Sequence, residues 1–299
     1  MDQVVRTSRL PMPGETLIGQ SLSQIPGGKG ANQAVAAARL GADVSIVGRI
    51  GSDGFGKRLL AQLVSEGIDV THVRQSADVS SGLAIISVDD NGQNCITVIP
   101  GANGLVTPDD VLSSESVIAN ADVMLLQLEI PLPTVLQAIE LAKKHRVQIL
   151  LNPAPAPLEV TDQLLRVDVL CPNETEAEIL TGLKIASIDD AFAACERLRD
   201  CGAKLSIVTL GSRGVVFCEG DGPAGRVPPY EIIALDTTAA GDAFAGALGV
   251  ALAEGRNTID AIRFASAAGA LAATRHGAQP AMPRREDVER FMIQQTHQG

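Results

Sequence analysis

The chain has 299 residues, a formal net charge of −11 and an isoelectric point near 4.8. That length allows one large domain or two modest ones, and the acidic balance argues against a nucleic-acid binder, which would carry a basic surface. Five cysteines without a C-x-x-C pair are typical of reduced thiols. Because no apolar run reaches the ~18 residues of a membrane span, we expect a cytoplasmic protein with no membrane partner.

Short β-rich runs alternate with helical patterns along most of the chain. Strands are expected at 44–48, 122–128, 147–152, 167–171 and 205–210, with helices at 57–66, 132–144, 173–181 and 189–201, and mostly helix from 241 on. Apolar strands that alternate with helices predict a mostly parallel sheet covered on both faces. The predicted fold class is therefore α/β.

One stretch departs from this alternation. Residues 82–88 and 94–99 are β-rich and flank a short polar gap that contains Asn91-Gly92, which predicts a hairpin. Residues 16–25 could pair with it, and a hairpin inside the main sheet is the alternative. We expect one apolar face of this hairpin to need covering, with the members Leu83, Ile85, Ile96 and Val98.

A glycine-rich turn at 26–30 precedes a strongly helical run at 33–41. Glycines such as Gly28 let a polar ligand approach the backbone closely, and Lys29 and Asn32 add donors beside that gap. An ordinary loop-to-helix turn with a solvated lysine is the alternative, and this segment alone favours it.

Residues 236–246 form the most informative segment, D-T-T-A-A-G-D-A-F-A-G, which runs into an apolar stretch. Small residues at a helix start leave backbone N–H groups free to bind an anion. Asp242 lies inside that site, where a carboxylate would repel a bound phosphate. A general base that takes a proton from an attacking hydroxyl explains its position, and a helix cap is the alternative.

The two segments together resemble the paired signatures of the ribokinase-like, or phosphofructokinase-B, carbohydrate kinase family. Further segments match in the same order, so that the resemblance covers essentially the whole chain, and the motifs are most similar to those of the ribose kinases. These segments are PGET (13–16), GSDGFG (51–56), QLE (127–129), LNPAPA (151–156), PNETE (172–176), TLGSRG (209–214) and RHGAQP (275–280).

The resemblance implies one ribokinase-like domain over 1–299, with a discontinuous β-lid from about 12–26 and 81–100. It implies ATP-dependent phosphorylation of the primary hydroxyl of a small sugar, first of all D-ribose to ribose 5-phosphate, with Mg²⁺ and an activating K⁺. It also implies a homodimer joined through the lids. Another furanose, deoxyribose or a nucleoside is the nearest alternative, and a non-catalytic sugar-binding or regulatory protein is an alternative of another class.

The same resemblance assigns roles to individual residues. Asp242 matches the catalytic base, and the backbone N–H groups of Ala239, Ala240 and Gly241 match the anion hole. The sugar-binding positions are Asp2, Gly28, Lys29, Asn32, Glu129 and Asp242. The nucleotide positions are Asn173, Glu176, Thr209, Gly211 and Gly214, and the monovalent-cation positions are Asp236, Thr238 and Ala273. Glu176 would also hold Mg²⁺ through water, although Asn173 and Glu176 also fit a capping box.

Three departures from the family pattern change these expectations. Met1 to Val5 match the middle of the family's first strand, so we expect that strand of the main sheet to be largely missing, the natural protein to start upstream, and Asp2 to be poorly held. Ala281 replaces a common Ser near the cation loop, which predicts weaker cation affinity. The sequence D-A-F-A-G at 242–246 replaces D-T-F-N-G and leaves the base in place.

Overall fold

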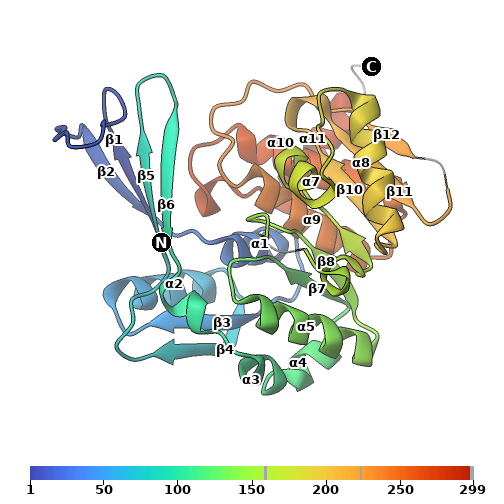
Figure 1. Ribbon diagram of the computed structural model, residues 1–299, viewed down its shortest axis with the longest axis horizontal. Helices are drawn as coiled ribbons and strands as arrows, with labels where there is room; N and C mark the ends of the chain where they lie inside the picture. The colour runs from blue at the N-terminus through green and yellow to red at the C-terminus, as the bar shows by residue number, and fades with distance from the viewer. Residues whose placement is uncertain (158–159, 223, 297–299) are drawn as a thin grey trace.

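The computed structural model describes residues 1–157, 160–222 and 224–296. Two parts are visible in Figure 1, a large α/β body and a four-stranded sheet that projects from it, here called the lid. In the described residues no helix is both long and apolar enough to cross a lipid bilayer.

The body is built on a six-stranded sheet with the order β12-β11-β10-β9-β8-β7. Strands β7 to β10 are parallel, and β11 and β12 are antiparallel additions at one edge. A separate parallel pair, β3 and β4, completes the strands of the body. The bounds are β3 (Ser45–Gly51), β4 (Asp69–Ser76), β7 (Val123–Leu126), β8 (Gln148–Leu151), β9 (Val169–Leu170), β10 (Leu205–Thr209), β11 (Val215–Glu219) and β12 (Gly225–Val227).

Helices cover both faces of the six-stranded sheet, which confirms the predicted fold class. The α-helices are α1 (Lys29–Arg39), α2 (Gly54–Ser65), α3 (Pro108–Leu112), α4 (Glu115–Ala119), α5 (Leu132–His145), α6 (Asp162–Leu165), α7 (Glu174–Thr181), α8 (Ile188–Asp200), α9 (Ala240–Ala253), α10 (Thr258–Ala273) and α11 (Arg285–Thr296). Short 3-10 helices lie at Gly101–Leu105, Gly211–Arg213 and Gln279–Ala281.

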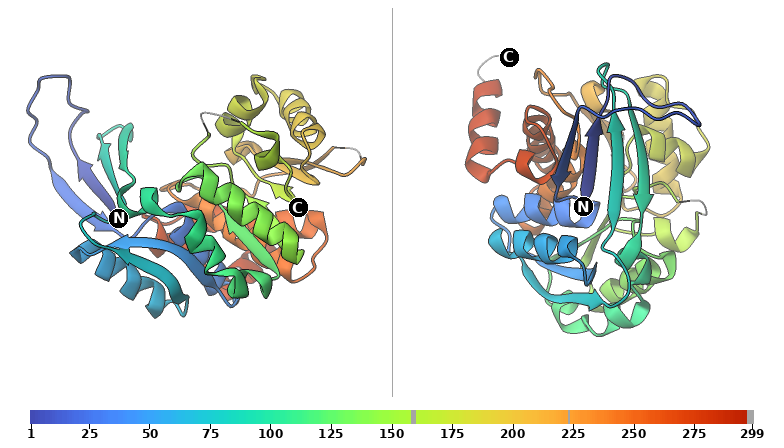
Figure 2. Two further views of the ribbon diagram at one scale, coloured as in Figure 1. Left: turned by 60° about the horizontal axis from the view of Figure 1, so that its bottom comes forward. Right: turned by 90° about the vertical axis from the view of Figure 1, so that its left-hand side faces the viewer.

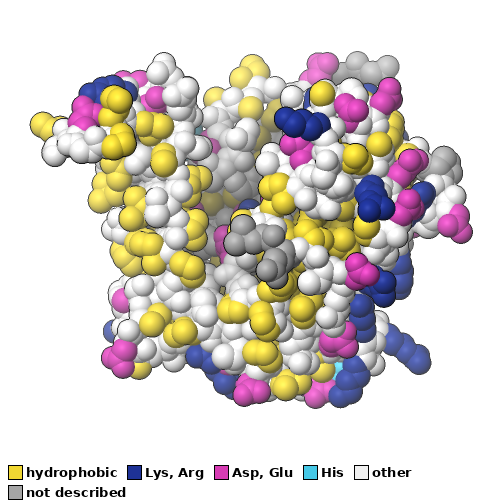
Figure 3. Space-filling view, viewed as in Figure 1, with side chains coloured by type: hydrophobic (Ala, Val, Ile, Leu, Met, Phe, Trp, Pro, Cys, Tyr) yellow, Lys and Arg dark blue, Asp and Glu magenta, His cyan; other side chains and the backbone are white. Residues whose placement is uncertain are grey.

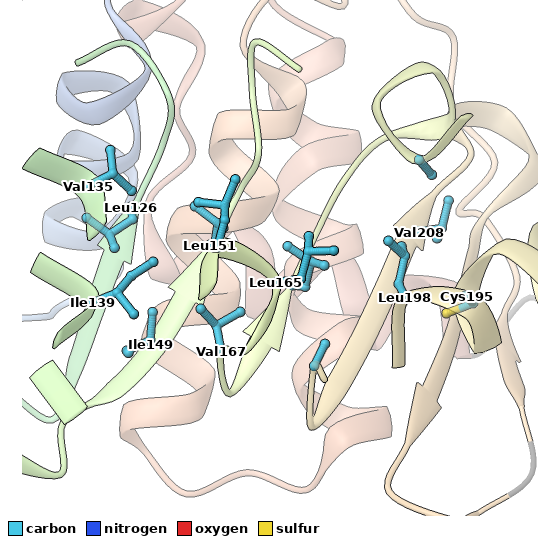
Figure 4. Close-up of a cluster of buried hydrophobic side chains, with 14 of the residues drawn as sticks. Leu126, Val135, Ile139, Ile149, Leu151, Leu165, Val167, Cys195, Leu198 and Val208 are labelled. Carbon is cyan, nitrogen blue, oxygen red and sulfur yellow. The ribbon is translucent and has the colours of Figure 1, made fainter. Parts of the chain in front are cut away.

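The strands of the body are continuously apolar because they are buried on both faces. In β8, Ile149 and Leu151 pack into the core beneath α5 and α8, whereas Leu150 between them packs beneath α9 and α10. Figure 4 shows the first of these cores, in which Ile149 and Leu151 lie among side chains from several helices. The alternation of side chains along a strand therefore supplies two cores at once.

Helices α1 and α9 approach each other closely. A Cβ atom at Gly246 would lie 2.7 Å from both the Cβ of Ala36 and the carbonyl oxygen of Gln33. Only glycine leaves room for this contact, which brings the middle of α1 beside the N-terminal half of α9.

The lid is a sheet with the order β2-β1-β5-β6, made of β1 (Asp2–Arg6), β2 (Ser21–Ile25), β5 (Leu83–Val88) and β6 (Asn94–Ile99). Figure 2 shows these strands standing away from the body. The predicted hairpin is β5 and β6, which are antiparallel. The expected pairing of residues 16–25 with this hairpin is wrong, because β2 pairs with β1, which lies between β2 and β5.

The six-stranded sheet contains no strand from the start of the described chain, which agrees with the expectation that the first strand of the main sheet is largely missing. The predicted place of Asp2 to Val5 in that sheet is wrong. Asp2 to Arg6 form a complete strand of the lid, antiparallel to β2 and parallel to β5, rather than the remainder of a strand in the main sheet. Asp2 is therefore held from both sides, and the side chain of Met1 is buried. A five-residue β-rich run fits either sheet, and only its pairing partners decide between them.

The expected apolar face of the hairpin is also wrong. Ile96 pairs with Ile86, which is adjacent to Ile85 and points to the other side of the sheet. Leu83 and Ile85 consequently lie on one face of the lid, whereas Ile96 and Val98 lie on the opposite face. Both faces of the lid thus carry apolar side chains.

Candidate active site

A cavity of about 220 Å³ lies at the carboxyl ends of the parallel strands, near the N-termini of α7 and α9. Figure 3 shows that the surface is hollowed between the lid and the body. The cavity is lined by Lys29, Asn152, Ala154, Cys171, Asn173, Glu176, Thr209, Thr237, Ala239, Gly241, Asp242 and Phe244. Residues predicted from widely separated segments therefore share one pocket, at the sheet edge where ligands of α/β proteins bind.

Asp242 lies in the first turn of α9 and is 6% exposed. Asn32 Nδ2 donates to Asp242 Oδ2 at 2.9 Å, and Gln33 Nε2 donates to Asp242 Oδ1 at 3.2 Å. The residue at the N-cap position is Ala239. Because Asp242 accepts its hydrogen bonds from α1 instead of from its own helix, the alternative of a helix cap is wrong.

Burial raises the pKa of Asp242, and the nearby Lys29 ammonium opposes that rise, as do the hydrogen bonds from Asn32 and Gln33. A desolvated carboxylate with a raised pKa is suited to accept a proton. Position, burial and pKa of this group are thus consistent with a general base.

The turn before α9 has an unusual backbone. Ala239 adopts a left-handed conformation with φ of 59°, which is uncommon for a residue with a side chain. Ala239 and Gly241 line the cavity, as predicted for an anion hole. The N–H group of Ala240 donates to the carbonyl oxygen of Thr237 at 3.2 Å.

The sugar-binding residues expected from the sequence gather beside the lid. The N–H group of Lys29 donates to Glu129 Oε2 at 2.9 Å, and Gly28 takes a φ of 96° at the N-cap of α1. A Cβ atom at Gly27 would lie 2.1 Å from Asp2 Oδ2, so that the Asp2 carboxylate lies against this turn. Burial raises the pKa of both Asp2 and Glu129, and each carboxylate is affected by the charge of Asp242.

The nucleotide-side residues lie at the start of α7. The side chain of Asn173 accepts from the N–H group of Glu176 at 2.8 Å, and the side chain of Glu176 accepts from the N–H group of Asn173 at 2.8 Å. The capping box allowed by the sequence is therefore confirmed. Glu176 is nevertheless 8% exposed and lines the cavity, and burial raises its pKa. Thr209 also lines the cavity.

Two further residues predicted to contact the nucleotide, Gly211 and Gly214, lie in the loop after β10. Gly211 begins a 3-10 turn and Gly214 ends it, and neither is among the residues that line the cavity. A Cβ atom at Gly214 would lie 2.4 Å from the carbonyl oxygen of Val227, so close packing alone explains why this position is a glycine.

The expected cation loop is closed by backbone hydrogen bonds. The two carboxylate oxygens of Asp236 accept from the N–H groups of Thr238 and Gly277, both at 2.9 Å. The carbonyl oxygen of Ala273 accepts from the N–H groups of Leu235 and Asp236. Within the described residues, no group of three or more His, Cys, Asp or Glu side chains is arranged to hold a metal ion.

Three amide side chains of the site have no role in the sequence interpretation. Gln33, Gln127 and Asn152 form a hydrogen-bonded chain that ends on Asp242. Gln127 and Asn152 occur in matched segments, but Gln33 follows the glycine turn as one residue of a helical run. The role of Gln33 is visible only from the direction in which its side chain points from α1. That direction is known only once the packing of α1 against α9 is known.

A buried carboxylate beside two helix N-termini suits phosphoryl transfer to an alcohol, because N–H groups can hold the phosphates while the carboxylate accepts the proton. A site of this kind, in an α/β body with a β-sheet lid, indicates a kinase of the α/β class. Comparison with known proteins gives the family: residues 1–285 match the family described as pfkB family carbohydrate kinase. The chain therefore belongs to the pfkB family of carbohydrate kinases.

Individual relatives agree with this assignment. The ribokinase of Haemophilus influenzae is 42% identical over 291 residues, which are 97% of this chain and 95% of that protein. The deoxyribokinase of Salmonella typhi is 37% identical over 293 residues, covering 98% and 95%. The structure of Arabidopsis thaliana ribokinase complexed with ribose and ATP has a TM-score of 0.89 and 32% identity, covering 97% of this chain and 95% of that chain.

Proposed function

We propose that this carbohydrate kinase transfers the γ-phosphoryl group of ATP to the primary hydroxyl of D-ribose and releases ADP and ribose 5-phosphate. The observation that carries the proposal is the buried Asp242 carboxylate, which lies in a cavity between two helix N-termini. The similarity to ribokinases over nearly the full chain supports ribose as the sugar.

In the proposed reaction, the sugar hydroxyl oxygen attacks the γ-phosphorus while its proton passes to Asp242. The bond between the γ-phosphorus and the bridging oxygen of ADP breaks, and ADP leaves. The N–H groups of Ala239 and Gly241, two residues that line the cavity, stabilise the charge on the transferring group, whereas the N–H group of Ala240 is engaged with Thr237. Asp2 and Glu129 accept hydrogen bonds from the sugar hydroxyls, and Lys29 and Asn32 complete the sugar site.

The donors present fit the implied metal ions. Glu176 offers one buried carboxylate at the nucleotide side of the cavity, and Mg²⁺ is commonly held by one or two carboxylates, waters and substrate phosphates. When bound there, Mg²⁺ would neutralise charge on the phosphates. Asp236 and Thr238 offer carboxylate and carbonyl oxygens with a lone pair to spare, which suits a monovalent cation such as K⁺, whereas the Ala273 carbonyl oxygen already accepts from the N–H groups of Leu235 and Asp236.

A parallel substrate assay tests the proposed function. ADP release is measured with D-ribose, 2-deoxyribose, fructose and adenosine at equal concentrations. We expect the highest kcat/KM with D-ribose. The similarity to a deoxyribokinase makes 2-deoxyribose the second candidate, and a higher kcat/KM with that sugar would replace ribose in the proposal. An absence of turnover with every sugar would favour a binding protein.

The cation proposal has its own test. We expect kcat to rise when KCl replaces a bulky inert monovalent salt at constant ionic strength. The half-saturating concentration should be high, since Ala281 offers no side-chain oxygen. An unchanged kcat over the whole titration would remove the cation site.

We further propose that the protein is a homodimer joined through its lid, and that it acts in the cytoplasm. The lid exposes large apolar side chains on both faces, and a second lid could cover one of them. The described cysteines are all free thiols, as in a reducing compartment.

A further inference from the structure

Gln33 lies at the centre of the site and is 1% exposed. Its amide nitrogen donates to Asp242 Oδ1 and to Asn152 Oδ1, each at 3.2 Å. Its amide oxygen accepts from Gln127 Nε2. The two hydrogens and the oxygen of the amide are therefore all engaged.

The direction of this hydrogen-bonded chain is fixed by its ends. A carboxylate only accepts hydrogen bonds, so Gln33 must turn its nitrogen toward Asp242. The amide nitrogen of Asn152 donates to the carbonyl oxygen of Cys171 at 3.0 Å, which leaves its oxygen facing Gln33. A flip of the Gln33 amide would thus break favourable contacts with Asp242, Asn152 and Gln127.

The chain is anchored on rigid elements. Gln127, Asn152 and Cys171 directly follow the parallel strands β7, β8 and β9. The Gly246 contact places the backbone of Gln33 against α9. The orientation of Gln33 is consequently set by the sheet and transmitted to the first turn of α9.

We propose that Gln33 is a positioning residue for the general base. It fixes the rotation of the Asp242 carboxylate, while Asn32 holds the second carboxylate oxygen at 2.9 Å. The proposal rests on the proposed role of Asp242 in proton transfer. Gln127 and Asn152 act one step farther away, because they determine which way Gln33 points.

The variant Gln33→Met keeps a similar length but has no strong hydrogen-bonding group. We expect kcat to fall about tenfold or more, in line with a lost hydrogen bond to a charged group, and the KM for ribose to change less than twofold. Gln33 also lowers the pKa of Asp242, so the acid limb of the kcat profile should move to higher pH. The other charged groups of the site stay unchanged in this variant: Lys29, which lowers the pKa of Asp242, and Glu176, Glu129 and Asp2, whose pKa values the charge of Asp242 raises.

A double variant separates positioning from general damage. If Gln33 acts through Asp242, Gln33→Met should cause no further loss of kcat in a chain that already carries Asp242→Asn. Gln127→Met should lower kcat in the same direction by a smaller factor. Gln62→Met makes the same exchange on α2, where Gln62 binds Glu66, and should leave kcat unchanged.

Equal losses of kcat from Gln33→Met in the presence and absence of Asp242 would overturn the positioning role. Normal kcat in Gln127→Met would overturn it as well, and this variant decides the question if Gln33→Met does not fold. A normal kcat in Asp242→Asn would instead reject the proposed base itself. A fall in Asp242→Asn with unaltered kcat in Gln33→Met would reject only the inference about Gln33.

Discussion

Lys29 acts on three of the four carboxylates of the site, of which Asp242 and Glu176 are buried and Glu129 and Asp2 are half-buried. It lowers the pKa of Asp242, Glu129 and Glu176, against the burial that raises each of them. The fourth carboxylate, Asp2, is influenced instead by the chain's α-amino group. A single ammonium group thus keeps three acids closer to ionisation than burial alone would allow.

Asp242→Asn should lower kcat by roughly 10²–10⁴-fold, the usual contribution of a general base, with little change in the KM for ATP. In this variant the new NH₂ group would face the NH₂ group of Asn32. The amide oxygen of Asn32 has no partner among the described residues, so the Asn32 amide can rotate by half a turn and accept the hydrogen bond with its oxygen. Steady-state kinetics together with a melting curve check both points. A variant with normal kcat and normal Tm would refute the base.

Activity should fall on the acid side at a higher pH than an ordinary aspartate would give. The base works only when ionised, and burial raises the pKa of Asp242 above its usual value of about 3.9. Lys29→Met removes an opposing charge, so the acid limb of kcat at saturating substrates should move farther toward high pH.

The matched control for that profile is Lys57→Met, which removes an exposed lysine of α2. Its acid limb should coincide with that of the unaltered protein. An identical limb in Lys29→Met would show that the lysine does not act on the base.

How far the sequence predicts the site differs from residue to residue. The glycine turns and Asp242 have signatures that local chemistry explains, whereas Glu129 was assigned by the family resemblance, and the structure brings them together. Gln33 has no such signature, since its role depends on the rotation of α1 against α9. Helix α1 also begins at Lys29, four residues before the predicted helical run, which places Asn32 in its first turn.

At the scale of elements, α7 begins with a side chain that has two tasks. Glu176 completes the capping box of the helix and also faces the cavity. The stability of this helix start and the proposed binding of nucleotide would therefore depend on the same carboxylate.

Glu176→Gln and Glu176→Ala should separate the two tasks. Glutamine is compatible with a capping box, so the first variant should keep the Tm while its KM for Mg²⁺-ATP rises. Alanine should also lose about 1 kcal/mol of stability, as lost caps typically do. Melting curves and nucleotide titrations measure the two effects.

Asn257→Ala is the control for the cap, because Asn257 caps α10 by accepting from the N–H group of Asp260. This variant should lower the Tm with no effect on nucleotide binding. An unchanged KM for Mg²⁺-ATP in Glu176→Gln would remove the glutamate from the nucleotide site.

Element types were predictable where both the run and its partners are local. The apolar runs at 147–152 and 205–210 became β8 and β10, and Asn91-Gly92 closed the hairpin between β5 and β6. The place of β1 was not predictable, because Asp2 to Arg6 pair with segments about 20 and 80 residues away. Register decided which face of the lid each apolar residue occupies, and register depends on that pairing.

For the whole molecule, the lid predicts assembly. Ile96 and Val98 are 53% and 61% exposed on the edge strand β6, and an unpaired edge with apolar side chains favours association. Light scattering at micromolar concentration should give about twice the chain mass of 31.1 kDa.

Val98→Glu should shift that mass toward the monomer, since a charge on the covered face would oppose burial. Ile293→Glu changes a residue of α11 that is 60% exposed, and the dimer should persist in this control. A monomeric unaltered protein, or a dimer unaffected by Val98→Glu, would contradict a lid interface.

The lid and the body contribute different carboxylates to the site: β1 carries Asp2, whereas α9 carries Asp242. The base is thus in place whether or not a sugar is bound, and water is also an acceptor for a phosphoryl group. In the proposed reaction the lid carboxylate distinguishes the two acceptors, because a water molecule is too small to contact Asp2, Glu129 and Asp242 together. Loosening β1 should accordingly lower phosphoryl transfer to the sugar and leave the slow transfer to water unchanged, so that a strand outside the catalytic body would set the choice of acceptor.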